Sequence, residues 1–340
     1  MKILITGITG RIGANVARHF IDKGHTVRGF VWPKDRQSTK LKQLGAEIVE
    51  GDLANSADVT SAAVDQEIIL HLGAAFQAGG PFTPEQYFDT NIKGTFNILE
   101  AAISQGTSLK HLIISSTDAV IQKYPEEGIS APLQTDTLPL DSTDWYSYSK
   151  ILTEHLFDRY IRHEKLPGTI FRYSLVFGAG EILNFPQFHL RTFINQIERR
   201  SDPEATAVLA DMRAEYTGEP HLIVARDRRG RPWKKHGIDV REIVHAYDRA
   251  VENPSTFGKI YQLASIQPFT WDTLVPYLAE QIRAPYSTFD LPITPTYYEY
   301  DLSSARRDFS YDPTLTVKQM VDDAVSFTRA KESGIIATQL

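Results

Sequence analysis

The chain opens with Lys2-Ile3-Leu4-Ile5-Thr6-Gly7-Ile8-Thr9-Gly10-Arg11-Ile12-Gly13, the stretch that decides its fold. A short apolar run is followed by three glycines at GxxGxxG spacing and then by an amphipathic segment, residues 14–23, in the order strand, turn, helix. Glycines let a backbone turn this tightly and approach a pyrophosphate, whose charge is then stabilised by the free N–H groups of the helix N-terminus. The stretch therefore predicts a dinucleotide phosphate loop, with an ordinary strand-to-helix turn as the alternative.

The composition excludes several classes of protein. With 340 residues, of which 42% are hydrophobic and 23% charged, the chain is long enough for one elaborated domain or for two. Its net charge of −6 argues against a nucleic-acid partner. The absence of cysteine excludes disulfides, thiolate metal sites and a cysteine nucleophile.

Three further expectations concern location and metal binding. No apolar run approaches the roughly 18 residues that a membrane-spanning helix needs, so we expect no membrane association. Because the sequence starts directly with the first strand, we see no room for a signal peptide and expect a cytoplasmic protein. The ten histidines lack the close spacing of metal ligands, so we expect no metal site.

The first half of the sequence alternates strand and helix patterns. Strands are predicted at residues 3–6, 26–31, 46–50, 67–72, 109–115 and 168–173. Helices are predicted at residues 14–23, 41–44, 56–63, 88–105 and 147–163. Continuously apolar strands separated by helices indicate a parallel sheet covered on both faces, which is an α/β fold of the Rossmann type with a doubly wound sheet.

The second half loses this rhythm. Residues 201–235 are polar, charged and irregular, with a hairpin or loop expected at 227–232. A helix at 239–252 and a strand at 259–263 return to the core, and short helices with many prolines follow. We therefore predict two interleaved lobes: a dinucleotide-binding Rossmann domain of residues 1–176 plus about 237–263, and a smaller substrate-binding lobe of about 177–236 plus 264–340.

A tyrosine and a lysine stand four residues apart in Asp144-Trp145-Tyr146-Ser147-Tyr148-Ser149-Lys150. On a helix, positions i and i+4 share a face, and an ammonium beside a phenol favours the phenolate. The pair would make tyrosine, whose pKa is ordinarily about 10, a usable acid or base near neutral pH. The pair also follows the fifth strand and opens a long helix, which supports a catalytic role over a solvated helix start with an aromatic anchor.

Seven motifs, in the same order along the chain, make the sequence similar to the extended short-chain dehydrogenase/reductase family, the group of NAD-dependent epimerases and dehydratases. The resemblance covers residues 1–180 well and 237–330 loosely. The motifs are the TGxxGxxG loop at 6–13, GDL at 51–53, HLGAA at 71–75, NIKGT at 91–95, ISSTDAV at 114–120, YSYSK at 146–150 with Glu154, and RYSLVFG at 172–178.

This resemblance implies a nicotinamide dinucleotide cofactor and three catalytic residues. Thr117 would hydrogen-bond the reacting hydroxyl or carbonyl, Tyr146 would move its proton, and Lys150 would hold the nicotinamide ribose and lower the tyrosine pKa. The implied cofactor-binding residues, besides Tyr146 and Lys150, are Gly7, Thr9, Gly10, Arg11, Ile12, Gly13, Arg28, Asp52, Leu53, Leu72, Gly73, Ala74, Ala75, Asn91, Ser115, Tyr173 and Leu175.

One departure from the family pattern concerns the reaction. Ser116-Thr117-Asp118 resembles the start of the sugar 4,6-dehydratase motif, which continues with glutamate, whereas Ala119 follows here. A dehydratase needs that carboxylate to remove a proton next to a carbonyl. We therefore do not expect 4,6-dehydratase activity.

A second departure concerns the cofactor. Members that prefer NAD end the second strand with an acid that binds the ribose 2′-OH, whereas Val31 holds that place here. Trp32 could stack on adenine and serve either cofactor. We expect NAD(P), with NADP(H) binding at least as well as NAD(H), unless the nearby basic residues are simply solvated. The basic residues that could reach a 2′-phosphate are Arg11, Arg28, Lys34 and Arg36.

Substrate contacts are expected from residues 78–88, 118–124, 174–236 and 264–300. A nucleotide sugar would need an arginine for its pyrophosphate, because a planar fork of donors matches the phosphate oxygens. The charged segment 224–236 is interpreted first as a surface hairpin, and the aromatic residues 297–300 as lobe packing. The candidate arginines are Arg191, Arg213, Arg231 and Arg241.

Three functions fit these observations. The leading hypothesis is an NAD(P)-dependent oxidoreductase or epimerase that transfers a hydride at a hydroxyl or carbonyl of a sugar-like substrate, nucleotide sugars included. The alternatives are an NADPH-dependent carbonyl reductase of the dihydroflavonol-reductase type and a non-catalytic dinucleotide-binding regulator. Helices 88–105 and 147–163 carry more apolar residues than one face needs, so we also predict a homodimer through a four-helix bundle, as is common in the family.

Overall fold

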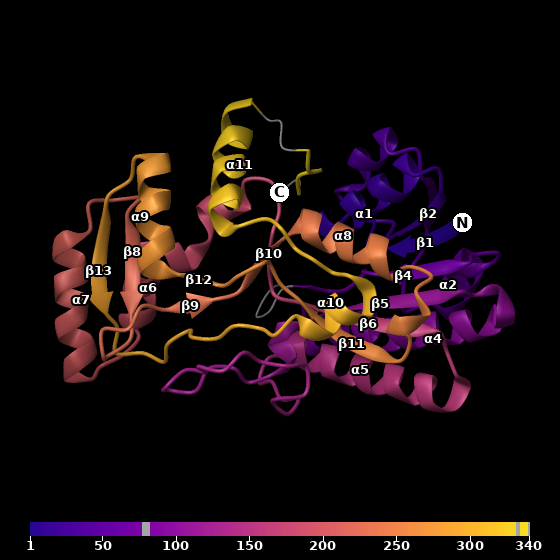
Figure 1. The fold of residues 1–340 in the computed structure, drawn as a ribbon, viewed down its shortest axis with the longest axis horizontal. Coiled ribbons are helices and arrows are strands. Elements are labelled where there is room, and N and C mark those ends of the chain that lie inside the picture. Colours follow the sequence, from indigo (N-terminus) through magenta and orange to yellow (C-terminus); the bar gives the residue numbers. More distant parts are fainter. Residues whose placement is uncertain (77–81, 331–333, 339–340) are drawn as a thin grey trace.

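The computed structural model describes residues 1–76, 82–330 and 334–338. A seven-stranded sheet runs through the larger of two lobes, and every neighbouring pair of its strands is parallel (Figure 1). The predicted α/β fold with a doubly wound sheet is therefore confirmed. In order across the sheet, the strands are β11 (Lys259–Leu263), β6 (Gly168–Tyr173), β5 (His111–Thr117), β4 (Ile68–His71), β1 (Lys2–Thr6), β2 (Thr26–Val31) and β3 (Glu47–Glu50).

Helices cover both faces of this sheet. Ile3 and Ile5 of β1 pack in one core with α1 and α8, whereas Leu4 packs in the opposite core with α2, α4 and α5. Successive side chains of a strand face opposite sides, so a continuously apolar strand needs cover on both. The covering helices are α1 (Arg11–Asp22), α2 (Ser56–Ala63), α4 (Gly94–Ser104), α5 (Trp145–Glu164) and α8 (Val240–Ala250).

The helix expected at 88–105 begins earlier and is interrupted. It starts as α3 (Pro84–Tyr87), continues as a π-helical turn (Phe88–Lys93) and ends as α4. Its buried face differs from the predicted one: Leu99 is buried as expected, but Phe96 is 43% exposed. A π turn adds one residue to a helical turn, so it changes which residues share a face before and after it.

The smaller lobe has a core of its own, built around the parallel pair of β8 and β13. The expectation that residues 201–235 are irregular is wrong, because a 13-residue helix and a strand lie within them. That helix buries only Ala205 and Met212, so it shows no apolar periodicity in the sequence. The elements of this lobe are α6 (Leu190–Ile197), α7 (Pro203–Glu215), β8 (Leu222–Arg226), α9 (Trp271–Ile282), β13 (Tyr286–Asp290) and α11 (Val317–Ala330).

Short elements lie where the lobes meet (Figure 1). β7 (Leu175–Phe177) pairs with β10 (Gly237–Asp239), and β9 (Lys234–Lys235) pairs with β12 (Phe269–Thr270). No described helix has both the length and the apolar character needed to cross a membrane. The other helical segments are α10 (Ser303–Phe309) and 3₁₀ turns at Ser38–Gln43, Gly106–Ser108, Asp118–Val120, Glu181–Asn184, Pro186–Phe188 and Pro254–Thr256.

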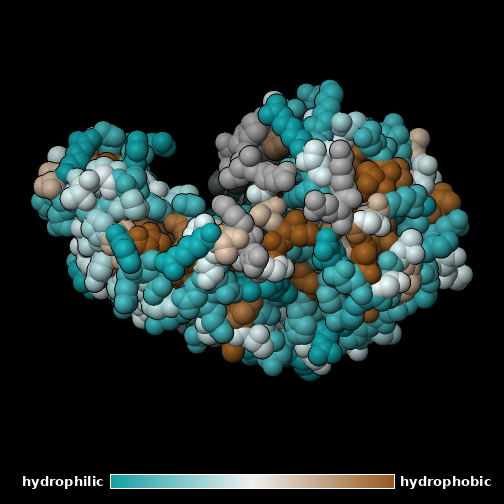
Figure 2. Space-filling model, turned by 90° about the horizontal axis from the view of Figure 1, so that it is seen from above, coloured by the Kyte–Doolittle hydropathy of each residue, from teal (hydrophilic) through white to brown (hydrophobic). Residues whose placement is uncertain are grey.

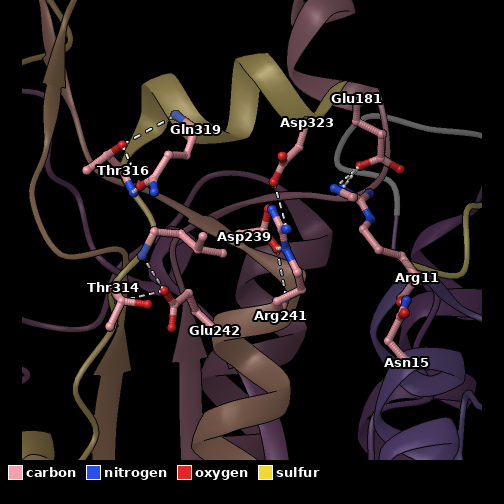
Figure 3. Close-up of polar contacts among 12 residues, drawn as sticks. Arg11, Asn15, Glu181, Asp239, Arg241, Glu242, Thr314, Thr316, Gln319 and Asp323 are labelled. Carbon is pink, nitrogen blue, oxygen red and sulfur yellow. Dashed lines mark hydrogen bonds and ion pairs between the residues drawn. The ribbon is translucent and has the colours of Figure 1, made fainter. Parts of the chain in front are cut away.

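The outline of the molecule narrows between the two lobes (Figure 2), and polar contacts tie them together (Figure 3). Arg241 of α8 pairs with Asp323 of α11 at 2.7 Å and with Asp239 at 2.8 Å. Glu242 accepts hydrogen bonds from the backbone N–H of Thr314 and of the following residue, at 2.7 and 2.6 Å. Since α8 and β11 both pack on the larger lobe, we propose the lobe division predicted from the sequence.

A buried ion pair joins three elements of the larger lobe. Arg172 of β6 donates to both carboxylate oxygens of Glu154 on α5, at 2.9 and 2.7 Å, and Ser116 of β5 donates to the same carboxylate at 2.6 Å. Both charged side chains are almost fully buried, at 4% and 2% exposed. The carboxylate of Glu154 thus holds the ends of two neighbouring strands against the long helix.

Replacing Glu154 by glutamine should destabilise the fold strongly. The isosteric amide keeps the shape but leaves Arg172 as a buried charge without a counter-ion, which typically costs about 3–5 kcal/mol. Urea denaturation would measure this loss in the free energy of unfolding. Asp158→Asn, one turn further along α5, breaks an exposed pair with Arg162 and serves as the control, with an expected loss of about 0–1 kcal/mol. Equal losses in the two variants would contradict the prediction.

Candidate active site

The glycine-rich loop lies where the order of the strands reverses. The chain adds β2 and β3 on one side of β1 but β4, β5 and β6 on the other. In open α/β sheets, ligands bind outside the carboxyl ends of the strands at such a point. The loop that follows β1 and the segment that follows β4 lie at this edge.

Three glycines shape the loop. Gly7 has a φ of +68°, and a Cβ there would lie 2.7 Å from the Cα of Gly73. A Cβ on Gly13 would lie only 2.2 Å from the carbonyl oxygen of Gly7. Gly10 is the N-cap of α1 and provides no side-chain cap, so donors of the first helical turn are left for a ligand.

The segment after β4 is held from both sides. The Thr6 hydroxyl accepts from the backbone N–H of Gly73 at 3.0 Å and lies 2.8 Å from Nδ1 of His71. Asn91 accepts from the backbone N–H of Ala75 at 2.8 Å and donates to its carbonyl at 3.0 Å. Burial lowers the pKa of His71 to about 3, so the ring is neutral and has a structural, hydrogen-bonding role.

The end of the second strand differs from the expectation. Arg28 donates to the carbonyls of Ala62 and Val64 at the end of α2, both at 3.0 Å, and pairs with a β3 glutamate. Because the Arg28 guanidinium is engaged in these contacts within the protein, we assign it a structural role and no longer propose that it binds a 2′-phosphate. The carboxylate of Asp35, in contrast, accepts a hydrogen bond from the Thr9 hydroxyl of the glycine-rich loop.

Other predicted cofactor residues have a variety of contacts. Arg11 pairs with Glu181 and donates to the carbonyl of Val176 at 2.6 Å, so it reaches from the loop toward the smaller lobe (Figure 3). The Tyr173 hydroxyl lies 2.6 Å from that of Tyr247, in the core beneath α8. Ile12 packs beside that core, Leu53, Leu72, Ala74 and Leu175 are half-buried, and Asp52 is exposed.

The predicted catalytic residues come from β5 and α5. Asp144 caps α5 by accepting from the backbone N–H of Ser147 at 2.9 Å, which places Tyr146 in the first turn. A hydrogen bond joins Tyr146 and Thr117. Lys150 donates to the carbonyl of Ser115 at 3.0 Å. The structure thus brings together all three predicted catalytic residues.

The electrostatics of this group differ from the expected pattern. Burial and the nearby Asp118 raise the pKa of Tyr146 well above its usual 10, while the hydrogen bond with Thr117 acts in the opposite direction. Burial lowers the pKa of Lys150 to about 8, with Glu154 opposing. Desolvation is thus the largest cause of the shift in the pKa of the phenol, and Tyr146 is protonated at neutral pH.

A polar cluster beside Tyr146 was not foreseen. The Tyr300 hydroxyl donates to the carboxylate of Asp118 at 2.7 Å. Lys123, fully buried, donates to the Asp118 carbonyl at 2.6 Å and lies 3.4 Å from its carboxylate. Lys123 is only five residues from Asp118, but Tyr300 is 182 residues away in the smaller lobe, so only the fold reveals it as their neighbour.

The candidate arginines for a pyrophosphate are mostly paired within the protein. Arg213 pairs with a glutamate of the preceding helix, Arg231 with Asp227, and Arg241 with two aspartates. Arg191 is exposed on α6. The expected hairpin at 227–232 is confirmed, because the backbone N–H of Asp227 donates to the carbonyl of Arg231. The Arg231 guanidinium stacks on the ring of Tyr297, which fits the interpretation of the aromatic residues 297–300 as lobe packing.

A nicotinamide dinucleotide fits the described residues. The glycine loop leaves no room for side chains and presents uncapped helical N–H groups to a pyrophosphate. Lys150 and Tyr146 share one helix face at the same edge of the sheet. Within the described ranges, no group of three or more histidine or acidic residues could hold a metal ion. Part of the stretch 78–88, expected to contact substrate, lies outside the described residues.

Comparisons with solved structures and characterised proteins agree with this geometry. A crystal structure of a short-chain dehydrogenase/reductase superfamily protein from Agrobacterium tumefaciens with bound NAD superposes with a TM-score of 0.82, at 28% identity, over 97% of this chain and 98% of that one. The 2-alkyl-3-oxoalkanoate reductase of Stenotrophomonas maltophilia is 25% identical over 337 residues, which is 94% of this chain and 97% of that protein.

A probable UDP-glucuronate 4-epimerase of Rhizobium meliloti is 33% identical over 195 residues, which is 52% of this chain and 54% of that protein. The model of the NAD dependent epimerase/dehydratase family matches residues 3–264. The resemblance predicted from seven short motifs is thus confirmed over most of the chain. The chain belongs to the NAD dependent epimerase/dehydratase family, as an extended short-chain dehydrogenase/reductase.

Proposed function

We propose that the protein is an NAD-dependent oxidoreductase that interconverts a hydroxyl and a carbonyl on a small substrate. The observation that carries this proposal is the grouping of Thr117, Tyr146 and Lys150 at the carboxyl edge of the sheet, beside the glycine-rich loop. A bound nicotinamide would accept or supply the hydride.

In this proposal, Tyr146 exchanges the proton of the reacting group. Because its pKa is raised, Tyr146 carries its proton at neutral pH, which is the form that can donate to a carbonyl oxygen during reduction. In the oxidation direction it must accept a proton, which the Thr117 hydrogen bond favours, since it stabilises a phenolate. Thr117 would also hydrogen-bond the reacting oxygen, and Lys150 would hold the nicotinamide ribose.

Two observations favour a small substrate over a nucleotide sugar. Three of the four candidate arginines are already paired with carboxylates and would have to break those pairs to bind a pyrophosphate. The reductase from Stenotrophomonas matches nearly the whole chain, whereas the probable epimerase matches about half. An NAD(P)-dependent epimerase remains the second candidate, because both reactions use the same tyrosine and lysine. The regulator hypothesis has no supporting contact of its own.

Replacing Tyr146 by phenylalanine should lower kcat by about 10²–10⁴-fold, the usual contribution of a positioned acid or base. Substrate would first be found by following NADH absorbance with a panel of hydroxy acids, sugars and alcohols. Tyr148→Phe is the matched control, because Tyr148 lies on the same helix but is 44% exposed. Turnover within a few-fold of wild type in the Tyr146 variant would rule out the assigned role.

The cofactor proposal revises the expectation of equal or better NADP binding. Arg28 is engaged at the end of α2, and the Asp35 carboxylate is hydrogen-bonded to the loop that would hold the pyrophosphate. Asp35 follows the last loop glycine by about the interval at which an acid binds the ribose 2′-OH in dinucleotide-binding folds. A carboxylate there accepts from a free hydroxyl and repels a 2′-phosphate.

NAD should therefore bind at least about tenfold more tightly than NADP, the value of one charge-assisted hydrogen bond. Calorimetric titration with each dinucleotide measures the ratio, and Asp35→Asn should narrow it. If NADP bound as tightly as NAD, and Arg36→Ala abolished NADP binding, then the basic residues after β2 would bind the 2′-phosphate and the role proposed for Asp35 would be wrong.

We also propose the homodimer expected from the sequence. Exposed apolar side chains gather on the helical segment from 84 to 104 and on α5, namely Phe88, Phe96, Trp145 and Tyr148. Large exposed aromatic groups of this kind mark association surfaces. Two such helices from each of two copies would form a four-helix bundle.

Sedimentation at micromolar concentration should give a dimer, and Phe96→Glu should give a monomer, because a carboxylate in the bundle would be desolvated. Tyr286→Glu alters an equally exposed aromatic residue on β13 of the smaller lobe and should leave the dimer intact. A monomeric wild-type protein would end this proposal.

A further inference from the structure

Lys235 is a buried cation with no carboxylate partner among the residues that the structure describes. It lies on β9 and is 9% exposed. Its ammonium donates to the side-chain oxygen of Gln187 at 3.1 Å and lies 5.1 Å from the centre of the Phe185 ring. An amide and an aromatic ring orient the ammonium but supply no negative charge.

The neighbouring lysines differ in this respect. Lys234, on the same strand, pairs with Glu299 at 3.3 Å and lies over the ring of Tyr297. Lys123 has the carboxylate of Asp118 at 3.4 Å. Each of these two cations has a counter-charge, whereas Lys235 has none among the described residues.

An unpaired ammonium out of water is unfavourable. The pKa of Lys235 is lowered to about 8, mainly by burial and to a smaller extent by Lys123, while Asp118 opposes both. At neutral pH the side chain is therefore still mostly protonated. A negatively charged group that enters beside it would form a charge-assisted hydrogen bond and offset the unfavourable burial.

Contacts connect Lys235 with the proposed catalytic residues. The next residue, His236, accepts the backbone N–H of Tyr300 at 3.1 Å, and Tyr300 donates to Asp118 at 2.7 Å. Asp118 raises the pKa of both Tyr146 and Lys235, so its carboxylate lies within electrostatic range of the two. β9 lies where the two lobes meet, close to β10 (Figure 1).

We propose that Lys235, with Gln187 beside it, binds a carboxylate of the substrate while the reacting hydroxyl or carbonyl lies at Tyr146. The inference rests on the proposed function, because it assigns the recognition part of the same site. One ammonium matches the single charge of a carboxylate, whereas a phosphate dianion would leave a negative charge uncompensated. The substrate class is thus a hydroxy or oxo acid.

Calorimetric titration of the NAD-saturated protein tests this without requiring turnover. The probes are 3-hydroxybutyrate, 3-hydroxyoctanoate, D-glucuronate and D-galacturonate, each compared with its primary amide, and glucose 6-phosphate compared with glucose. At least one acid should bind about tenfold or more tightly than its amide, the value of a charge-assisted hydrogen bond. Lys235→Met should abolish that preference, and Lys235→Arg should retain part of it.

Lys234→Met is the matched control, because this neighbour already has Glu299 as its partner, and the acid preference should change by less than about twofold. The proposal is overturned if no acid binds better than its amide, if Lys235→Met keeps the preference, or if only the phosphate ester is distinguished. Tyr146→Phe reports separately on the proposed reaction: full turnover in that variant would remove the function but not the carboxylate site.

Discussion

The close approach of backbone at Gly7, Gly13 and Gly73 is the constraint on which the site depends. A Cβ at Gly13 would lie 2.2 Å from the carbonyl oxygen of Gly7, and one at Gly7 would lie 2.7 Å from Gly73. The ends of β1 and β4 and the start of α1 can meet only because none of these residues has a side chain. From Gly73 the contacts run on: Asn91 holds Ala75 and donates to Ser149 of α5 at 2.8 Å. The glycine-rich loop and α5 therefore belong to one hydrogen-bonded framework.

Burial gives the proposed catalytic pair, Tyr146 and Lys150, properties that proximity alone would not. Phe76 and Tyr87 pack against the ring of Tyr146, and Tyr87 is itself buried. In such surroundings burial disfavours the phenolate and raises the pKa of Tyr146. The lysine in turn is anchored to a β5 carbonyl. A cofactor and substrate that enter this site change its charge, so the proton affinity of Tyr146 depends on what is bound.

The parts of the fold and site that could be predicted from the sequence are those encoded locally. The glycine loop and the Tyr146–Lys150 pair each lie within a few adjacent residues at a strand end or a helix turn, and the family resemblance points to Thr117 through a similarly short motif. The contacts of Arg28 and Asp35 could not be predicted, because their partners lie 26 to 36 positions away in the sequence. Helix α7 was missed because its few buried side chains leave no apolar period, although Asp202 followed by Pro203 is a helix-start signal.

The sequence also does not show which basic residues of the smaller lobe are available to bind a substrate. Residues 226–235 include four arginines and two lysines, and nothing in their spacing distinguishes a structural cation from a binding one. The fold makes the distinction by supplying counter-charges: Arg231 has Asp227, Lys234 has Glu299, and Arg228 has two glutamates. A cation that already has a carboxylate gains little from a second anion, because it would have to exchange one ion pair for another. Lys235 is buried without a counter-charge among the described residues, so an anion beside it would be the most stabilising. For this reason we assign recognition of the substrate carboxylate to Lys235 rather than to the neighbouring arginines.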